Sequence, residues 1–283
     1  MAVKVDFIIL GAAKAGTTTM ADILSNHPAV NFCKEKEPNF FSTTDNWKAN
    51  IEKYHCLYEE EKGKIYGEAS HSYTALPLYN LNIWEDIYDY NSNMKFVYIV
   101  RNPIDRFISA YMQNYQRGRF DYSIDEAIHK SKNIHRSRYY TQILPFIEKF
   151  GRDNVMIIDF DDFIKDRKVV LEKLSDFLKL SLDKFDLDEN KHSNVSVNSI
   201  KLNAKYDWIV KRFSVLTHLI PNKVKMAVKR MLVNKKRVFK EKPRLTKEQQ
   251  ETIIRLTRMD TLALSKLINK DLSGWLQTVD NNN

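Results

Sequence analysis

The chain has 283 residues, of which 43% are hydrophobic and 12% aromatic, and its formal net charge is +9. This length and apolar content predict one enlarged α/β domain, because no internal repeat or low-complexity linker divides the chain. The two cysteines, Cys33 and Cys56, exclude a disulfide framework, and neither stands at a metal-ligand spacing from a histidine. No apolar run reaches the about 18 residues of a membrane span, so we expect a protein of the reducing cytoplasm.

The first predicted element is a buried strand at residues 5–10, VDFIIL, which the glycine-rich turn GAAKAGTTT follows at residues 11–19. We expect a helix to begin at Met20, where apolar residues take up a helical spacing. A turn between a strand and a helix gathers backbone N–H groups at the positive end of the helix dipole. Lys14 adds a full charge and the threonines add hydroxyl donors. The segment therefore predicts an anion site.

The spacing of this turn excludes the loop of nucleoside triphosphatases. Their pattern, GxxxxGK[ST], would need a lysine at position 17, whereas Thr17 stands there and the lysine is Lys14. An ordinary strand-to-helix turn without a ligand is the alternative interpretation. The lysine together with the threonine cluster favours the anion site.

A second strand-to-helix passage, KFVYIVRNPIDRFISAY, spans residues 95–111. Its apolar and β-branched start suits a central strand of a parallel sheet, and Asn102-Pro103 should end that strand. Ser109 lies about two turns into the helix that we expect next. Arg101 stands at the carboxyl end of the strand, where open α/β sheets place ligand contacts, and its forked guanidinium suits a phosphate. A solvated loop is the alternative.

The later elements repeat this alternation. Residues 153–163 predict a strand followed by a turn, and residues 169–178 predict a helix. Strand and helix alternate from residue 5 to 180, which indicates a parallel sheet. A further helix is expected near Thr246, which would form a capping box with Gln249.

The positive charge is concentrated in residues 201–242, where lysines and arginines alternate with apolar residues. Three interpretations compete for this segment. It contributes to a nucleotide site, it docks an acidic or membrane-attached acceptor, or it is a solvated helical face. We expect the first two roles in different places, with peripheral contact to the inner membrane face through residues 205–240.

Several segments, in this order, resemble the sulfotransferases that use 3′-phosphoadenosine-5′-phosphosulfate (PAPS). They are GAAKAGTTT, SNHP at 25–28, KEPNFFS at 36–42, GEASHSY at 67–73 and FVYIVRNPIDRFISAY. The similarity is greater to heparan-sulfate-type and bacterial carbohydrate sulfotransferases than to the cytosolic aryl and steroid enzymes. It implies a P-loop-like, three-layer α/β/α fold with a central, mainly parallel sheet. It also implies a single domain over residues 1–283, with its core at about 5–180 and a helical, basic C-terminal part at about 195–278.

The resemblance assigns two groups of residues to the nucleotide. It implies that the 5′-phosphosulfate is bound by Lys14, Ala15, Gly16, Thr17, Thr18 and Thr19. It implies that the 3′-phosphate is bound by Arg101 and Ser109. A late basic loop would add Lys235, Lys236 and Arg237. The product would be adenosine 3′,5′-bisphosphate (PAP), and no metal ion is implied.

The resemblance also assigns the catalytic groups. Glu37 matches the general base toward the acceptor hydroxyl, and Lys14 would neutralise charge on the departing phosphate oxygen of an in-line displacement. Without the resemblance, the run Lys-Glu-Lys-Glu at 34–37 would be interpreted as solvated surface. Phe40 and Phe41 indicate instead that the backbone enters the core just after Glu37.

Glu68 matches a glutamate that heparan-type enzymes follow with a lysine. Ala69 stands at that position here, which argues against a heparan-like acidic acceptor. His71 is the nearest titratable group, and it is the second candidate base, although a lone histidine is more often structural. We expect Glu68, His71 and Trp47 to contact the substrate.

The acceptor implied by the resemblance is a carbohydrate or glycolipid, at a hydroxyl or an amine. The segments 43–64 and 115–139 are expected to line its pocket. A non-sugar natural product with His71 as base is an alternative, and so is a non-enzymatic binder of RNA or acidic polysaccharide. No RNA-binding signature is present, so no nucleic acid partner is expected. The position of Lys14 weighs against a magnesium-dependent kinase. The enzyme is expected to be bacterial and cytoplasmic.

Overall fold

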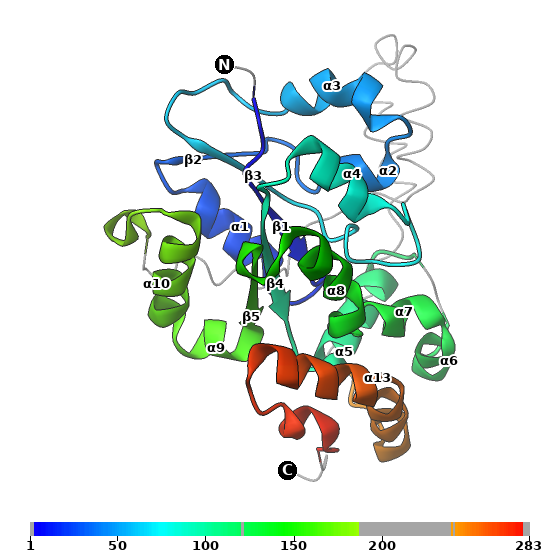
Figure 1. The fold of residues 1–283 in the computed structure, drawn as a ribbon. Coiled ribbons are helices and arrows are strands. Elements are labelled where there is room, and N and C mark those ends of the chain that lie inside the picture. Colours follow the sequence, from blue (N-terminus) through cyan, green and yellow to red (C-terminus); the bar gives the residue numbers. More distant parts are fainter. Residues whose placement is uncertain (1–2, 120–121, 187–238, 240, 280–283) are drawn as a thin grey trace, which may run out of the picture.

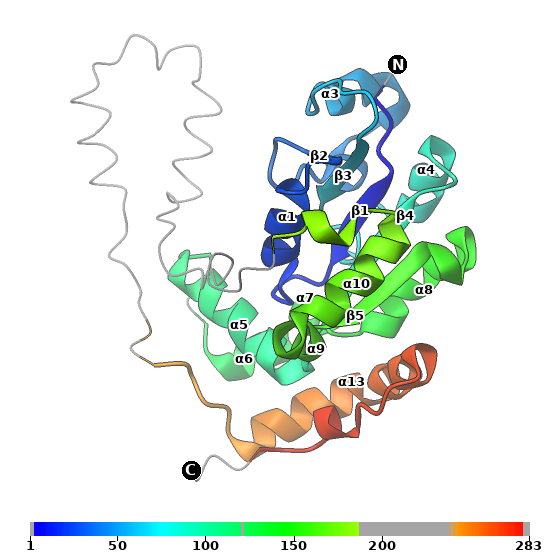
Figure 2. The same cartoon turned by 90° about the vertical axis from the view of Figure 1, so that its left-hand side faces the viewer.

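The computed structural model describes residues 3–119, 122–186, 239 and 241–279. Its centre is one sheet of five parallel strands in the order β2-β3-β1-β4-β5. The strands are β1 (Phe7–Gly11), β2 (Val30–Phe32), β3 (Ile65–Ala69), β4 (Lys95–Val100) and β5 (Val155–Asp159). Helices cover both faces of the sheet (Figure 1 and Figure 2). The predicted α/β fold with a central parallel sheet is confirmed.

The two middle strands, β1 and β4, are apolar along their length because both of their faces are covered. All five residues of β1 are buried, and successive side chains of a strand point to opposite faces. Phe7 of β1 is paired with Gly67 of β3. A Cβ atom on Gly67 would lie 2.1 Å from the Phe7 ring. Glycine at this position therefore makes room for a large aromatic side chain in the core.

The helices follow the strands in the expected alternation. They are α1 (Thr17–Ser25), α2 (Phe40–Thr43), α3 (Ile51–His55), α4 (Ile83–Tyr90), α5 (Pro103–Gln116), α6 (Ile124–His129), α7 (Ser131–His135), α8 (Tyr139–Phe150), α9 (Phe160–Lys165), α10 (Arg167–Leu178) and α13 (Lys247–Ile268). Short 3-10 helices lie at Trp47–Asn50, Arg152–Asn154, Leu182–Lys184 and Ser273–Leu276.

Two predicted boundaries were wrong by a few residues. Helix α1 begins at Thr17 and not at Met20, because Gly16 takes the left-handed conformation of φ 89° and ends the turn early. Helix α9 replaces the turn expected up to residue 163. It begins directly after β5 because the Asp159 side chain accepts a hydrogen bond from the Asp161 N–H at 3.0 Å.

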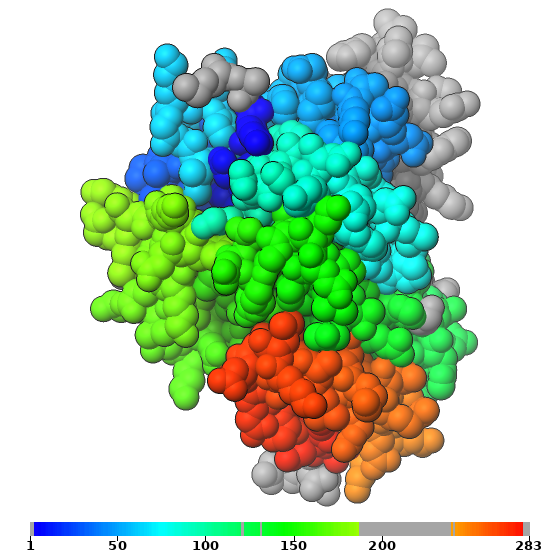
Figure 3. All heavy atoms as spheres, viewed as in Figure 1, coloured from blue at the N-terminus to red at the C-terminus, as the bar shows by residue number. Residues whose placement is uncertain are grey.

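The C-terminal helix α13 packs against α8 and α5. Its orange to red atoms lie against the green atoms of α8 in the space-filling view (Figure 3). The predicted capping box of Thr246 and Gln249 is confirmed at its first turn. The carboxylate of Asp260 accepts hydrogen bonds from the backbone N–H groups of Tyr140 at 3.0 Å and Thr141 at 2.8 Å. These bonds fix α13 to the start of α8, and they confirm a helical C-terminal region.

Part of the sequence analysis falls outside the described residues. The basic segment 205–238, including Lys235, Lys236 and Arg237, belongs to this part, so its proposed nucleotide and membrane contacts stay predictions. Among the helices that are described, none combines the length and the apolar character needed to cross a membrane.

Candidate active site

The loop between β1 and α1 lies at the carboxyl edge of the sheet. Lys14 in this loop has φ 74° and Gly16 has φ 89°, and a Cβ atom on Gly16 would lie 3.0 Å from the Phe160 ring. The loop is tied to the sheet by a hydrogen bond of 2.7 Å from the Ala12 N–H to the carbonyl of Ile99. No side chain caps the start of α1. The first N–H groups of this helix are therefore placed to bind an anion.

Arg101 is held directly beside this loop. Its Nη1 donates to the carbonyl of Lys14 at 3.3 Å, and its guanidinium carbon lies 4.5 Å from the centre of the Phe160 ring. The hydroxyl of Tyr139 donates to the Arg101 carbonyl at 2.6 Å. Within the described part of the chain, the buried Nε of Arg101 has no hydrogen-bond partner. Ser109 is half-buried in α5, and no hydrogen bond joins it to Arg101.

Glu37 and His71 lie next to each other although they come from different loops. The Glu37 Oε2 lies 3.3 Å from the His71 Nε2, and their side chains are 39% and 27% exposed. In the charged run that precedes them, residues 34–36 are exposed and Glu37 is half-buried. Phe40 and Phe41 are buried, as the sequence predicts. The run therefore leaves the solvent at Glu37, and the backbone takes φ 56° there.

Asn39 holds these two loops together, and the sequence analysis missed it. Its amide Nδ2 donates to the carbonyl of Glu37 at 2.5 Å, and its Oδ1 accepts from the Ser72 hydroxyl at 2.5 Å. Its backbone N–H donates to the Ser70 hydroxyl at 3.0 Å. Asparagine tolerates the left-handed φ of 54° found here. The only sequence signal was an asparagine between the candidate base and the buried aromatic pair.

Glu68 lies below this network and has no exposed surface. Its carboxylate accepts hydrogen bonds from the hydroxyls of Tyr54 at 2.6 Å, Ser70 at 2.5 Å and Tyr73 at 2.9 Å. This corrects the expectation of a direct substrate contact, because the side chain is enclosed by its hydrogen-bond donors. Glu68 instead orients the Ser70 hydroxyl, which accepts the hydrogen bond from the Asn39 N–H. Glu68 is therefore connected to Glu37 only through Ser70 and Asn39.

Burial raises the pKa of the Glu68 carboxyl above its ordinary value of 4.5, and the hydroxyl donors oppose this rise only partly. The folded state therefore binds the proton more tightly than the unfolded state. Protonated Glu68 therefore adds to the free energy of unfolding at pH values below its ordinary pKa. This contribution is lost as pH rises through the raised pKa of the folded state. We expect the unfolding free energy of wild type to fall relative to that of Glu68→Gln as pH rises from about 4 to 8. Urea denaturation of both proteins from about pH 4 to pH 8 measures this, and a constant difference contradicts it.

One hollow brings the anion loop and the two candidate bases together. It has a volume of about 200 Å³, and its lining includes Thr17, Thr18, Ala69, Glu37 and His71. The first turn of α1 therefore faces the same space as the Glu37 carboxylate. A group held on the helix N-terminus and a second molecule in contact with Glu37 would meet there.

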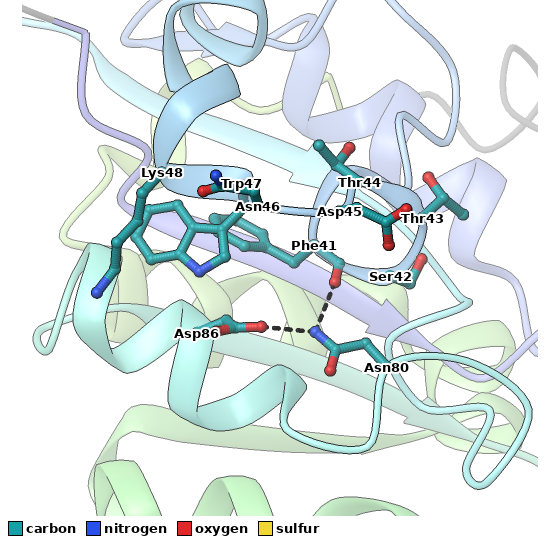
Figure 4. A pocket seen from close by; sticks show the side chains of 10 residues that line it. All are labelled: Phe41, Ser42, Thr43, Thr44, Asp45, Asn46, Trp47, Lys48, Asn80 and Asp86. Carbon is teal, nitrogen blue, oxygen red and sulfur yellow. Dashed lines mark hydrogen bonds between the residues drawn. The ribbon is translucent and has the colours of Figure 1, made fainter.

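Trp47 lies in a different hollow, of about 530 Å³, together with Phe41, Asn80 and Asp86 (Figure 4). Its ring packs edge-on against Phe41 at 5.5 Å and Tyr90 at 6.2 Å between ring centres. Neither Glu37 nor His71 lines this hollow. The structure thus brings Glu37 and His71 to one hollow with the first turn of α1, and it joins Arg101 to Lys14 in the loop before that turn. It places Trp47 in another hollow.

Several positive charges act on Lys14 in the loop before α1. Burial lowers the pKa of Lys14, and the charges of Arg117, Arg101 and Lys36 lower it further, while Glu37 opposes them. Within the described residues, neither Lys14 nor either of these arginines forms a salt bridge with a carboxylate. Cations gathered without a carboxylate partner attract a multiply charged anion.

A parallel α/β sheet with a glycine-containing loop between its first strand and an uncapped helix is typical of a P-loop-like fold. The sequence model of the sulfotransferase domain matches residues 4–269. The chain therefore belongs to the sulfotransferase family. The described residues contain no group of three or more histidine, cysteine, aspartate or glutamate side chains arranged to hold a metal ion.

Known proteins of this family have limited similarity to the chain. Heparan sulfate glucosamine 3-O-sulfotransferase 5 of Mus musculus is 27% identical over 188 residues, which are 61% of this chain and 53% of that protein. Luciferin sulfotransferase of Photinus pyralis is 25% identical over 202 residues, covering 68% of this chain and 50% of that protein. The chain thus spans about half the length of these relatives. A sulfotransferase from Alicyclobacillus acidocaldarius has the same fold, with a TM-score of 0.66 at 22% identity, over 97% of this chain and all of that one.

Proposed function

We propose that this protein transfers the sulfuryl group of PAPS to a hydroxyl or amine of a carbohydrate or glycolipid acceptor. The hollow shared by α1, Glu37 and His71 carries this proposal, because the first turn of α1 and a glutamate side chain line the same space. Membership of the sulfotransferase family supports it. The sugar acceptor rests on the 3-O-sulfotransferase relative. A small non-sugar acceptor, as in the name of the luciferin sulfotransferase, is the second candidate.

The residues present fit PAPS. The uncapped N-terminus of α1 and Lys14 would hold the 5′-phosphosulfate. Arg101 would hold the 3′-phosphate, since its buried Nε lacks a partner among the described residues, and Ser109 would assist it. When bound, PAPS supplies an activated sulfuryl group with a phosphate as its leaving group. The late basic residues Lys235, Lys236 and Arg237 stay candidates for closing this site.

Glu37 is the proposed general base. It takes the acceptor proton while the acceptor oxygen or nitrogen bonds to sulfur and the bond from sulfur to the phosphate oxygen breaks. Lys14 stabilises the charge that develops on that phosphate oxygen. His71 keeps the Glu37 carboxylate in place through the contact of 3.3 Å. The same contact makes His71 the second candidate base, with Glu37 then orienting its ring.

PAP binding tests this proposal without knowledge of the acceptor. PAP at about a hundredfold excess over its Kd stabilises the native state by about 2.7 kcal/mol, which appears as a rise in melting temperature. We expect this rise for wild type in buffer with a chelator, and we expect Arg101→Met to abolish most of it. Arg258 is exposed on α13, so Arg258→Gln is the matched control and should show the same rise in melting temperature as wild type. A folded wild type that shows no rise would exclude PAPS as the donor.

A further inference from the structure

Arg101, the candidate ligand of the 3′-phosphate, lies just beyond the hydrogen-bonded part of the sheet. The pairing of β4 with β5 ends at Val100, which stands opposite Asp159. The hydroxyl of Tyr139, in the first turn of α8, donates to the Arg101 carbonyl at 2.6 Å. This bond takes over from the sheet, because it fixes the backbone from which the Arg101 side chain extends.

The Arg101 side chain has few restraints of its own. Its Nη1 donates to the Lys14 carbonyl at 3.3 Å, which is longer than the usual distance of about 2.9 Å. Its guanidinium lies over the Phe160 ring, and its buried Nε has no hydrogen-bond partner in the described part of the chain. The direction of the free donors therefore depends on the position of the backbone.

Tyr139 is itself held in one place by close packing. It has no exposed surface. Its ring packs edge-on against Tyr98 of β4 and Trp275 of the last 3-10 helix, at 6.2 Å between ring centres in both cases. Both neighbouring rings are buried as well. Densely packed rings keep a fixed orientation, so the Tyr139 hydroxyl stays at the Arg101 carbonyl.

The residues just before Tyr139 are attached to two other helices. The Ser137 hydroxyl accepts a hydrogen bond of 2.5 Å from Nε of Arg106, an α5 residue that is 1% exposed. The Arg138 Nε donates to the carbonyl of Leu256 in α13 at 3.2 Å. Buried polar groups stabilise a structure only when they are satisfied, so these bonds specify one position for the start of α8.

The first turn of α8 is capped by a residue of α13. The N-cap residue of α8 makes no side-chain capping bond. Asp260, which is 8% exposed, instead accepts from the N–H groups of Tyr140 and Thr141 and from the Thr141 hydroxyl at 2.7 Å. Gln142 further exchanges hydrogen bonds of 2.8 and 3.0 Å with the backbone of Leu76 in the loop after β3. An external carboxylate thus satisfies N–H groups that a helix leaves unpaired at its start.

We propose that Tyr139 is a positioning residue that aims Arg101 at the 3′-phosphate of the donor, and that Asp260 couples α13 to this site through α8. This rests on the proposed function. The contacts run from Asp260 to the first turn of α8, and from Tyr139 to the Arg101 carbonyl. A guanidinium binds phosphate through directional hydrogen bonds, so a displaced backbone weakens the contact even where the arginine is present.

Two nucleotides that differ in one group test the inference. PAP carries the 3′-phosphate, and adenosine 5′-phosphate does not. We expect Tyr139→Phe, which keeps the ring and removes the hydroxyl, to weaken PAP binding by about fivefold or more in calorimetry. Its affinity for adenosine 5′-phosphate should stay that of wild type, whereas a general loss of structure would lower both affinities. Tyr140→Phe removes a hydroxyl from the next, half-buried residue and should keep both affinities.

A double variant shows whether Tyr139 acts through Arg101. In the Arg101→Met background, Tyr139→Phe should cause no further loss of PAP affinity, because the side chain that it positions is gone. Losses that add up in the double variant would overturn the inference. Wild-type PAP affinity in Tyr139→Phe, or an equal loss for both nucleotides, would also overturn it.

Asp260→Asn tests the contribution of α13. It keeps the size of the side chain but turns one acceptor oxygen into a donor that faces the N–H groups of α8. We expect the same selective loss of PAP affinity, and this variant replaces Tyr139→Phe if that protein does not fold. Unchanged PAP affinity in Asp260→Asn would overturn the coupling of α13. A wild type that binds both nucleotides equally, or neither, contradicts the proposed donor site itself.

Discussion

Glu37→Gln is expected to lower kcat for sulfuryl transfer by about 10²–10⁴-fold and to leave PAP binding nearly unchanged. Glutamine has the shape of glutamate but does not accept the acceptor proton. Asn39 binds the backbone carbonyl of Glu37 rather than its side chain, so the loop should keep its conformation. The measurement is transfer of radiolabelled sulfuryl from PAPS to a pool of acidic and neutral oligosaccharides, with PAP binding followed in parallel.

Two further variants make this result specific. Glu251→Gln removes the same charge from an exposed position on α13 and should keep wild-type activity. His71→Gln decides between the two candidate bases, because it should cost less than Glu37→Gln if His71 only positions the carboxylate. A loss that is larger for His71→Gln would assign the base to His71. Equal activity of Glu37→Gln and wild type would remove Glu37 from the mechanism.

The sequence predicted the fold well because the relevant signals are local. The apolar runs of β1 and β4 and the capping box of Thr246 and Gln249 each lie within a few neighbouring residues. The start of α1 was misplaced because threonines are weak helix formers. The position of the helix start depends on the backbone conformation of Gly16, which the sequence does not display.

Less of the candidate site could be predicted from the sequence, because many of its contacts join residues that are far apart in the chain. Lys14 and Arg101 stand at strand ends, and topology alone brings such positions to one edge of a sheet. Asn39 joins two loops whose residues are 31 and 33 positions apart, and Gln142 reaches a loop 66 positions away. Contacts of this kind depend on tertiary structure. The burial of Glu68 was not visible either, because its hydroxyl donors are scattered over residues 54–73.

Lys14→Met is expected to lower kcat by about 10²–10³-fold, comparable to the loss of one donor to an oxyanion. The methionine side chain has a similar length but no charge, so the phosphate oxygen that departs from sulfur would lose its nearest cation. Burial and the nearby arginines lower the pKa of Lys14, and these cations would favour its neutral form if no anion were present. A bound phosphosulfate reverses this effect, because its negative charge stabilises the ammonium.

This reversal gives Lys14 a second, independent test. PAP binding by wild type should take up protons at alkaline pH, because the lowered pKa of Lys14 rises again in the complex. Calorimetry in two buffers of different ionisation enthalpy measures the uptake, which should disappear in Lys14→Met. Lys184→Met, an exposed lysine paired only with the adjacent Asp183 among the described residues, is the matched control and should keep both kcat and uptake. If Lys14→Met retained wild-type kcat and proton uptake, the charge on the leaving group would have to be stabilised by Arg101 and the N-terminus of α1 alone.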